Sequence, residues 1–502
     1  MKDHVNMFGG SPLNRLSWLR SSPSFLNGLI GSPKTRFLLF NAGQPLLLTK
    51  APDFAQNAGT LAFLSVNQVK PFLGQEPYFN QAKTPGELIS KEEETSFTEA
   101  ARHRGLPLVF LGLHEPQSDH GHGALPSSEF SSKSTDAANV IAKIEGTPYF
   151  SFDVADLELS EEEMTRILTE TGATNDEQKL IWSDARAVMS TMSSFEGAVY
   201  AEARSMVDWN WRNKFCPGCG SPQYSLWGGW KITCSSLLPW ADNSNRKRPC
   251  PSGKGLQNYA HPRTDGVVIM CTVDRSGDKI LLGRSRKFPF KFFSALAGFI
   301  EPGETFEDAV SRELWEEAGI QIYPNSVVYH SGQPWPYPAN LMCGFYARAD
   351  ERKEVRVDLD NELVEAKWYT REDVLEILNW GKEGEGTKIE WKKVSEAEKK
   401  AEDEQQKVMA QARARAQAQG QGEGKKEGEI LSVWTENKDH QDVVEDKEKG
   451  KEKGKGKDEP PFRIPPTTAI AGVLIRDWAV GKVKFEPIEG DGEELVAKIS
   501  NL

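Results

Sequence analysis

Short hydrophobic runs bounded by turn residues recur along the first part of the chain. The runs RFLLF, PLLL, LAFLSV, LVFLGL and YFSFDV have the length and composition of strands. A polar stretch at 117–136 is expected to be a loop, and residues 160–200 carry a helical pattern with a Ser-x-x-Glu start. We therefore predict a mixed α/β domain over residues 34–205, after a flexible lead-in at 1–33 that is rich in Ser, Pro, Gly and Asn.

A second series of strand-like runs begins after residue 262. GVVIMCTVD and KILLGRS are separated by a Ser-Gly-Asp turn, and FSALAGF, VVYHSGQPW, LMCGFYARA, VRVDL and EAKWYT follow. Helices are expected from Arg371 onward and over about 467–478. This pattern predicts a second α/β domain over 263–380 and 461–485, in which helices pack on a mixed sheet.

The stretch at 381–460 interrupts that second domain. It consists mostly of Glu, Lys, Gln, Ala and Gly, and such a segment cannot bury enough apolar surface to offset the entropy of ordering. We expect a disordered low-complexity insertion in a surface loop, because stability depends only weakly on loop length. Two alternatives remain: a solvated single helix in the Ala/Gln-rich part, or a weak arm for RNA or a protein partner in the basic clusters.

One amphipathic segment of the second domain has clear signals at both ends. Thr305 followed by Asp308 is typical of a helix start, and Gly319 is typical of a helix end, so we predict a helix of about 13 residues between them. One stripe of this helix is apolar and can pack on a sheet, whereas an adjacent face carries carboxylates, because residues three and four apart are neighbours on a helix. The apolar residues are Val310, Leu314 and Ala318, and the carboxylates are Glu313, Glu316 and Glu317.

Carboxylates so close together repel one another unless a cation lies among them. Arg312 is one candidate cation and could pair with Glu304 or Glu316. A divalent metal ion is the other, since Mg²⁺ is usually held by carboxylates together with substrate phosphates. The alternative is an ordinary solvated acidic helix face.

The spacing of the whole segment favours the metal site. The chain reads G-x5-E-x7-R-E-U-x-E-E-x-G-U, where U is apolar, and every position is filled. This pattern resembles the Nudix box, and the resemblance implies a Nudix hydrolase with an α/β/α sandwich fold. Such enzymes cleave a nucleoside diphosphate linked to another group. The positions of the motif are Gly298, Glu304, Arg312, Glu313, Leu314, Glu316, Glu317, Gly319 and Ile320.

Four of the six cysteines lie in one part of the chain and indicate a zinc site. Cys216 and Cys219 form a C-x2-C pair followed by glycine, whereas Cys234 and Cys250 follow singly. Four thiolates satisfy a tetrahedral Zn²⁺, and a closed shell of four protein ligands is structural. We predict a zinc-ribbon-like module at 206–262. The alternatives are a thioredoxin-like redox pair and free buried thiols.

Composition narrows the class of protein. A charged content of 27% and a formal charge of −12 fit a soluble protein with a disordered part and argue against broad nucleic-acid binding. No hydrophobic run approaches a membrane span, and neither secretion nor a mitochondrial presequence is expected. Cysteines in such a chain favour metal ligands or buried thiols over disulfides. Cys271 and Cys343 lie in strand patterns and are expected to be inert core thiols.

A second motif follows the box at 331–342, which reads SGQPWPYPANLM. Its alternating prolines are expected to fix an extended, rigid backbone that presents Trp335 and Tyr337 as flat faces. Aromatic faces stack on heterocycles, and the alternative is a proline-stiffened structural loop.

The order of all these motifs is more specific than any one of them. The four-cysteine knuckle, PRTD at 262–265, the box, QPWPYP and IPP at 464–466 follow one another along the chain. This arrangement resembles the NADH pyrophosphatases, a branch of the Nudix hydrolases, in their eukaryotic form. The resemblance is strong over about 205–380 and 462–480, and loose over the N-terminal domain.

This resemblance implies that the chain hydrolyses NADH, and also NAD⁺, to AMP and reduced nicotinamide mononucleotide (the oxidised mononucleotide from NAD⁺). It implies Mg²⁺ or Mn²⁺ as the catalytic ion, a structural Zn²⁺ and a homodimer. The implied ligands of the catalytic ion are the carbonyl of Ala297 and the carboxylates of Glu313, Glu316, Glu317 and Glu362, with Glu365 as a less favoured neighbour. Arg312 and Glu304 complete the catalytic group, and which glutamate takes the proton from water stays open.

The same resemblance implies the residues that contact the dinucleotide. They are Ala297, Gly298, Phe299, Gln333, Pro334, Trp335, Pro336, Tyr337, Pro338, Ala339, Asn340, Ala471 and His261. The chain departs from the family pattern in three of these places: His261 replaces a tyrosine, Tyr337 replaces a phenylalanine, and Asn340 replaces a serine. At position 261 a histidine ring takes the place of the stacking tyrosine, and a histidine ring can also stack.

Two rival functions share the same motifs. One is removal of the NAD cap from RNA by the same chemistry, and the other is a catalytically weak Nudix domain that senses nucleotides. The last three residues, Ser500, Asn501 and Leu502, resemble a peroxisomal tripeptide of the S-K-L type. We expect peroxisomal import through its receptor, with a cytoplasmic pool; an ordinary frayed tail is the alternative.

Overall fold

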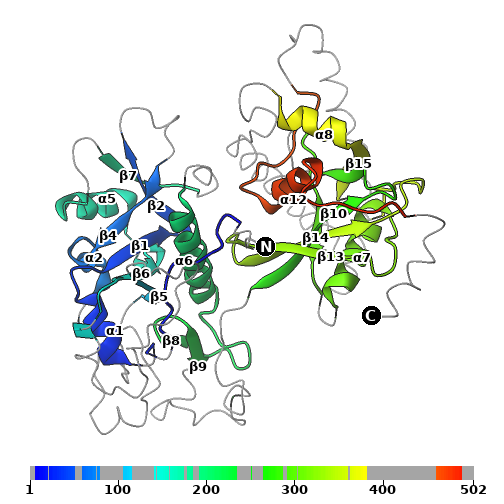
Figure 1. The fold of residues 1–502 in the computed structure, drawn as a ribbon. Helices are drawn as coiled ribbons and strands as arrows, with labels where there is room; N and C mark the ends of the chain where they lie inside the picture. Colours follow the sequence, from blue (N-terminus) through cyan, green and yellow to red (C-terminus); the bar gives the residue numbers. More distant parts are fainter. Residues whose placement is uncertain are drawn as a thin grey trace, which may run out of the picture. The chain divides into compact units, whose positions relative to one another are not determined.

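The computed structural model describes residues 6–17, 19–20, 22–50, 59–74, 76–79, 106–115, 141–142, 144–157, 159–173, 178–184, 192–234, 250, 264–285, 291–301, 304–359, 362–380 and 460–488. These residues belong to two compact units, each described by itself (Figure 1). The first unit runs from Met1 to Val267 and also includes Ser331–Cys343. The second comprises Val268–His330 and Gly344–Leu502.

The first unit contains a seven-stranded mixed sheet with the order β3-β2-β1-β6-β5, in which β4 also pairs with β1 and β7 with β2. Strands β1 and β6 are parallel, and the other described pairs are antiparallel. The strands are β1 (Arg36–Asn41), β2 (Gln44–Lys50), β3 (Thr60–Leu61), β4 (Phe63–Ser65), β5 (Val109–His114), β6 (Thr147–Asp153) and β7 (Gln178–Trp182). The helices are α1 (Pro23–Ile30), α2 (Val66–Leu73), α5 (Glu161–Glu170) and α6 (Ser194–Arg212).

Helices cover both faces of this sheet. Successive residues of a strand point to opposite faces, so neighbouring residues of β1 pack on different helices. Phe37 and Leu39 of β1 belong to a large buried core that also contains side chains of α1, α2 and α5. Phe40 points the other way and meets Tyr200 of α6, with the ring centroids 6.2 Å apart. Full burial of one such phenylalanine contributes about 2 kcal/mol.

The structure corrects two expectations for this unit. The lead-in was expected to be flexible, yet Leu13, Leu16 and the apolar side of α1 are buried in its described part. The high content of Ser, Pro and Gly obscured the apolar residues of this segment, whose side chains reach the core. The continuous helical pattern at 160–200 was also wrong, because strand β7 pairs with β2 between α5 and α6.

A small hairpin follows α6 and consists of β8 (Gln223–Leu226) and β9 (Lys231–Cys234). Its turn contains Gly228 and Gly229, both with positive φ, which glycine adopts at little cost. The Phe110 amide of β5 donates to the carbonyl oxygen of Gly228 at 2.8 Å. The turn therefore docks on the sheet of the first unit, and a Cβ at position 229 would press on Val109.

The second unit is built on a six-stranded sheet with the order β13-β14-β10-β11-β15, in which β12 also pairs with β10. The strands are β10 (Asp265–Val273), β11 (Lys279–Ser285), β12 (Leu296–Phe299), β13 (Val328–Trp335), β14 (Asn340–Arg348) and β15 (Leu363–Thr370). The helices are α7 (Phe306–Ala318), α8 (Arg371–Leu378) and α12 (Ile470–Ala479). The outer parts of β13 and β14 are the residues that group with the first unit.

Two neighbouring residues of β14 show that α7 and α12 lie on opposite faces of this sheet. Phe345 meets Phe306 of α7, with the ring centroids 5.5 Å apart. The next residue, Tyr346, donates its hydroxyl to the carbonyl oxygen of Leu474 in α12 at 2.7 Å. Since consecutive strand residues point to opposite faces, the sheet is enclosed between the two helices.

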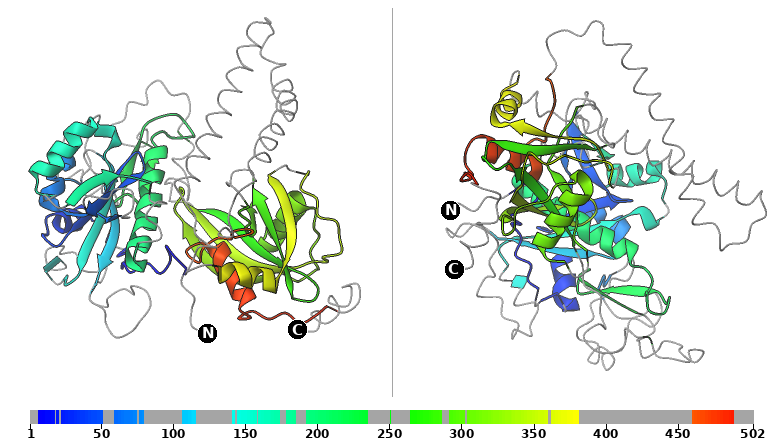
Figure 2. Two further views of the ribbon diagram at one scale, coloured as in Figure 1. Left: turned by 90° about the horizontal axis from the view of Figure 1, so that it is seen from above. Right: turned by 90° about the vertical axis from the view of Figure 1, so that its right-hand side faces the viewer.

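Helix α12 is also tied to α8 and to the turn after β10, and Figures 1 and 2 both show α12 beside α8. The Trp478 indole donates to the carbonyl oxygen of Gly277 at 3.0 Å. Arg371, the first residue of α8, donates to the same carbonyl oxygen at 3.0 Å and to that of Trp478. A Cβ at Gly472 would collide with the backbone carbonyls of Pro465 and Pro466, so the IPP segment packs directly on the first turn of α12.

Other expectations for the second unit have mixed outcomes. Helix α12 begins three residues later than expected, at Ile470. The VRVDL run is not a strand, and residues 354–358 have no regular structure. Cys271 and Cys343 are buried as expected, and burial raises the pKa of both thiols. The insertion lies outside the described residues except for Pro460.

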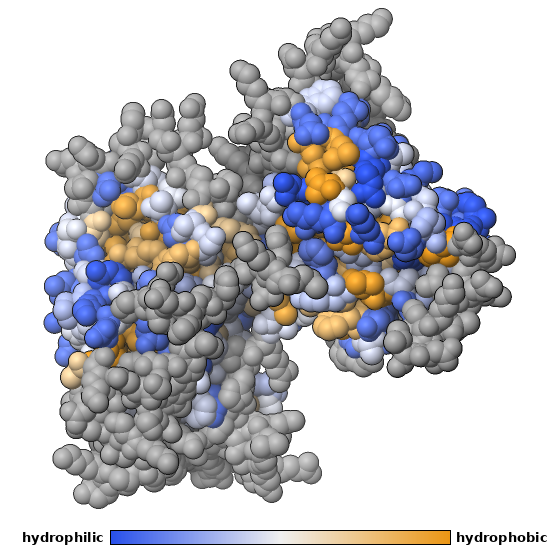
Figure 3. All heavy atoms as spheres, in the orientation of Figure 1, coloured by the Kyte–Doolittle hydropathy of each residue, from blue (hydrophilic) through white to orange (hydrophobic). Residues whose placement is uncertain are grey.

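Within the described part of the chain, no helix is both long enough and apolar enough to cross a membrane. On the face seen in Figure 3, hydrophobic patches lie among hydrophilic residues on both units.

Candidate active site

Helix α7 has the bounds and the ends that its sequence predicts. It spans 13 residues, the Thr305 hydroxyl accepts from the Asp308 amide at 3.2 Å, and the Asp308 carboxylate accepts from the Thr305 amide at 3.0 Å. Gly319 ends the helix in the left-handed conformation with φ 64°. The apolar stripe of Val310, Leu314 and Ala318 is completely buried, which fixes the acidic side of the helix relative to the sheet.

Arg312 organises the acidic side. Its Nε and Nη2 donate to the Glu304 carboxylate at 2.5 and 2.9 Å, and its Nη1 donates to Glu313 at 2.7 Å and to Glu316 at 2.9 Å. Nη2 also donates to the carbonyl oxygen of Phe299 in β12 at 2.8 Å. One guanidinium therefore holds three carboxylates and one strand in a single arrangement.

The electrostatics differ among these carboxylates. The hydrogen bonds from Arg312 are the main reason that the pKa of Glu304 falls to about 2. Burial raises the pKa of Glu313, Arg312 opposes this effect, and repulsion from Glu316 and Glu362 adds to it. The bonds to Glu304 and the other carboxylates raise the pKa of Arg312, so its positive charge is secure. Glu313, Glu316 and Glu362 together carry more negative charge than the single positive charge of Arg312 neutralises.

Gly298 makes room for the Glu313 carboxylate. A Cβ built at position 298 would collide with the carboxylate carbon and both oxygens of Glu313. Glycine at the start of the motif is therefore needed so that β12 and α7 can approach each other closely. Ala297 and Phe299 flank this contact in β12, and the Phe299 ring is 56% exposed.

The remaining glutamates lie at different depths. Glu317 is 4% exposed, whereas the Glu316 side chain is 47% exposed. Glu362 precedes β15 and is near enough to influence the charge of Glu313. Glu365 is engaged elsewhere, since it pairs with Arg284 at 3.6 Å and with Lys367. Carboxylate oxygens with surplus negative charge fit a hard divalent cation, so the residues present suit Mg²⁺ or Mn²⁺.

The aromatic motif lies in the first unit and differs from its expected shape. The backbone is extended only as far as Trp335, the end of β13, and residues 336–339 form the turn between β13 and β14. The Trp335 and Tyr337 rings meet edge to face with centroids 5.2 Å apart. The two rings are therefore paired and held in place as expected. The backbone that holds them is a turn, whereas an extended segment was expected.

The other residues of this motif are partly or fully buried. Gln333 is buried, and Ala339 accepts through its carbonyl oxygen from the Asp265 amide at 3.0 Å. Asn340 donates to the carbonyl oxygen of Tyr337 at 3.4 Å, and its own Oδ1 is a buried acceptor without a hydrogen-bond partner among the described residues. Pro334, Pro336 and Pro338 belong to the same hairpin. Ala471 is buried in α12 of the second unit, and His261 lies outside the described residues.

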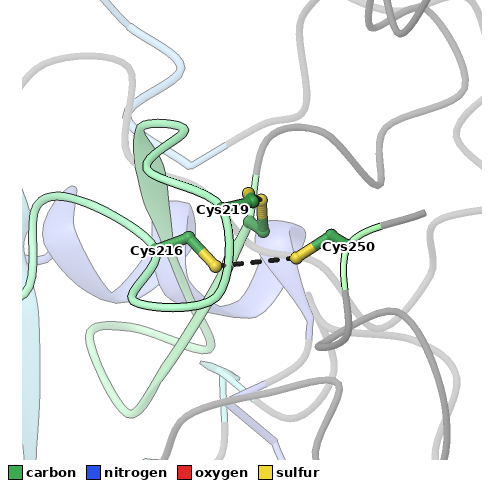
Figure 4. A group of neighbouring side chains, drawn as sticks. Cys216, Cys219 and Cys250 are labelled. Atoms are coloured by element: carbon green, nitrogen blue, oxygen red, sulfur yellow. Dashed lines mark hydrogen bonds between the residues drawn. The ribbon is translucent and has the colours of Figure 1, made fainter. Parts of the chain in front are cut away.

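The four cysteines converge in the structure. Figure 4 shows three of them, Cys216, Cys219 and Cys250. Their four Sγ atoms lie within 4.8 Å of one another, with Cys216 to Cys250 at 3.7 Å and Cys219 to Cys234 at 3.3 Å. Tetrahedral Zn²⁺ with Zn–S bonds of about 2.3 Å requires sulfur separations of about 3.8 Å. The cluster fits a zinc ion, and within the described part of the chain it is the one group of potential ligands gathered this tightly.

Sequence reasoning missed the residues that hold the aromatic motif. Asn6 and Phe8 contact it from the start of the chain, and Ser205 of α6 donates to the carbonyl oxygen of Pro338 at 3.3 Å. No local pattern marks Asn6 or Phe8, since their partners lie more than 300 residues away along the chain.

Comparisons with known proteins identify the family of this chain. A model described as the NUDIX domain matches residues 262–391. An NAD-capped RNA hydrolase of Schizosaccharomyces pombe is 34% identical over 374 residues, which are 74% of this chain and 85% of that protein. NAD-capped RNA hydrolase NPY1 of Saccharomyces cerevisiae is 30% identical over 389 residues, 76% of this chain and 88% of that protein. Human NAD-capped RNA hydrolase NUDT12 is 46% identical over 188 residues, 38% of this chain and 37% of that protein.

The first two relatives are matched over most of their length, and the family model covers the box, α7 and the aromatic motif. The chain belongs to the Nudix hydrolases, in their NADH pyrophosphatase branch, and is an enzyme that acts on pyrophosphate bonds.

Proposed function

We propose that this chain hydrolyses the pyrophosphate bond of NADH and NAD⁺ with the help of Mg²⁺ or Mn²⁺. The products are AMP and the nicotinamide mononucleotide, reduced when the substrate is NADH. The observation that carries this proposal is the arrangement around Arg312, in which Glu304, Glu313 and Glu316 are held on one side of α7. Such a surplus of carboxylate oxygens suits a hard cation and a phosphate substrate.

Glu313 and Glu317, with Glu362 and the Ala297 carbonyl, would hold the ion. When bound, it supplies Lewis acid polarisation of the phosphoryl group and compensates the charge of the leaving phosphate. Arg312 holds the Glu313 and Glu316 carboxylates together through its hydrogen bonds at 2.7 and 2.9 Å. Gly298 allows the Glu313 carboxylate to approach β12, the strand that carries Ala297.

Glu316 is the carboxylate that suits proton transfer. Its side chain is 47% exposed, so water reaches it, whereas Glu317 is almost completely buried. The hydrogen bond from Arg312 holds Glu316 in position as a general base for the attacking water.

Trp335 and Tyr337 are proposed to receive a base of the dinucleotide. Their edge-to-face pairing fixes both rings, and a flat heterocycle gains from stacking on a fixed aromatic face.

Removal of the NAD cap from RNA is the second candidate, and the names of the relatives favour it. The test measures kcat/KM for NADH, NAD⁺ and a short NAD-capped RNA under identical metal concentrations. A higher value for NADH supports the main proposal, and a higher value for the RNA supports decapping. No metal-dependent release of the nicotinamide mononucleotide from any of the three would contradict both and favour a nucleotide sensor.

Replacing Gly298 by alanine is expected to lower kcat by about a hundredfold. The added methyl group occupies the space of the Glu313 carboxylate, and a shift of about 1 Å in a catalytic group has an effect of that size. The measurement is steady-state NADH turnover together with thermal unfolding. Gly31→Ala is a matched control, because φ at Gly31 is −66° and a Cβ there meets only ordinary contacts. Equal turnover of the two variants would contradict the proposed place of Glu313.

Three expectations stay predictions, because their residues or partners lie outside the described structure. They are the homodimer, the disordered nature of the insertion, and peroxisomal import through Ser500, Asn501 and Leu502.

A further inference from the structure

The first described residues of the chain lie on the aromatic motif. The Asn6 side-chain amide donates to the Ser331 hydroxyl at 3.0 Å and to the carbonyl oxygen of Gly332 at 2.8 Å. In return, the Gln333 amide donates to the carbonyl oxygen of Met7 at 3.1 Å. Asn6, Ser331 and Gln333 are all buried, and hydrogen bonds between buried groups are costly to lose because the remaining partner is left unsatisfied.

Phe8 continues this contact with its ring. The ring meets Trp335 edge to face at 6.2 Å and Tyr337 edge to face at 6.4 Å. Since Trp335 and Tyr337 also meet each other, the three rings form a closed group. Phe8 is 3% exposed, so this ring touches protein and cannot serve as a base-stacking face itself.

Helix α6 supports the N-terminal segment from the other side. Tyr200 meets the Phe8 ring at 6.0 Å. Gly197, one turn earlier, has no side chain where Met7 packs, and a Cβ there would lie 2.7 Å from the Met7 methyl group. Residues 6–8 are therefore enclosed between α6 and the β13–β14 turn, all within the first unit.

We propose that residues 6–8 position the substrate site: they fix the orientation of Trp335 and Tyr337 and thereby set the affinity for the base of the dinucleotide. This inference rests on the proposed function, because it assumes that these two rings bind the base. Phe8 acts through the rings and touches no reacting atom, so its loss affects substrate binding more than the chemical step.

The test compares Phe8→Leu with wild type and with Phe25→Leu. Phe25 is a matched control, since it is buried to a similar degree and its ring also meets another ring, that of Phe110, edge to face. Loss of ring contacts of this kind changes binding by about tenfold. We expect KM for NADH to rise on the order of tenfold in Phe8→Leu, with kcat within about twofold of wild type. Phe8→Tyr, which keeps the ring, should restore KM.

A second readout does not depend on the substrate. Hydrogen exchange of the amides at 331–343 should be faster in Phe8→Leu than in wild type, and unchanged in Phe25→Leu. Asn6→Ala should accelerate the same amides, and this variant serves if Phe8→Leu does not fold. Unchanged KM and unchanged exchange in these variants would overturn the inference while the proposed function stands. Fast exchange in Phe8→Leu together with no NADH turnover by wild type would instead overturn the proposed function.

Discussion

Replacement of Glu317 by glutamine is expected to lower kcat about a thousandfold while the protein stays folded. Glutamine has the same shape, so the packing of this side chain, which is 4% exposed, is retained. The variant loses the negative charge and one oxygen ligand, and charge stabilisation by a bound ion is worth several kcal/mol in the transition state. A loss of about 4 kcal/mol corresponds to a thousandfold. Steady-state turnover of NADH at saturating substrate measures the effect.

Glu307→Gln is the matched control on the same helix. Glu307 lies in the first turn of α7, is exposed, and does not belong to the motif. Its replacement changes the same charge on the same element and should leave kcat within about twofold, because an exposed charge near a helix end contributes only a few tenths of a kcal/mol. A folded Glu317→Gln protein as active as Glu307→Gln would contradict the role of Glu317 as a metal ligand.

Replacement of Cys216 by serine is expected to remove zinc and to lower the melting temperature on the order of 10 °C. The cluster has four sulfur ligands in reach of one ion, and a structural zinc site contributes its binding energy to folding. The measurements are the zinc content per chain and thermal unfolding with and without a chelator. The chelator should lower the melting temperature of wild type and leave that of Cys216→Ser almost unchanged.

Cys343→Ser is the control that distinguishes the effect of losing zinc from the effect of losing a buried thiol. Cys343 is as buried as Cys250 but lies in β14, away from the cluster in the chain. Its replacement buries a hydroxyl and costs stability without loss of zinc. If wild type contains no zinc and resists the chelator, the cluster is a group of buried thiols and the zinc hypothesis is wrong.

The parts of the fold that could be predicted are those encoded locally. The ends of α7 follow from Thr305, Asp308 and Gly319, whose hydrogen bonds connect residues at most a few positions apart. The ion pairs of Arg312 with Glu304 and Glu316 follow in the same way from helical spacing and from one short loop. The convergence of the cysteines could be predicted from the C-x2-C pair, because that spacing is typical of sites that gather four thiolates.

What could not be predicted depends on contacts between distant parts of the chain. Strand β7 has only moderate strand character, and its pairing with β2, more than 100 residues earlier, decides its conformation. The leucines of the lead-in that are buried in the structure stand among turn-forming residues in the sequence, so no regular hydrophobic pattern marks them. In the site, the need for Gly298 arises from the distance between β12 and α7, and the contact of Asn6 with Ser331 spans 325 positions.

The alternation of Phe345 and Tyr346 restricts how this domain can change in length during evolution. Deletion of one residue in β14 would exchange the two faces, so that the tyrosine hydroxyl would point to the α7 layer without the carbonyl of Leu474 as its acceptor. An insertion or deletion within β14 therefore disrupts the packing on one of its two faces. The connection between α8 and α12 differs in this respect, because it joins two helices that Arg371 and Trp478 already hold together.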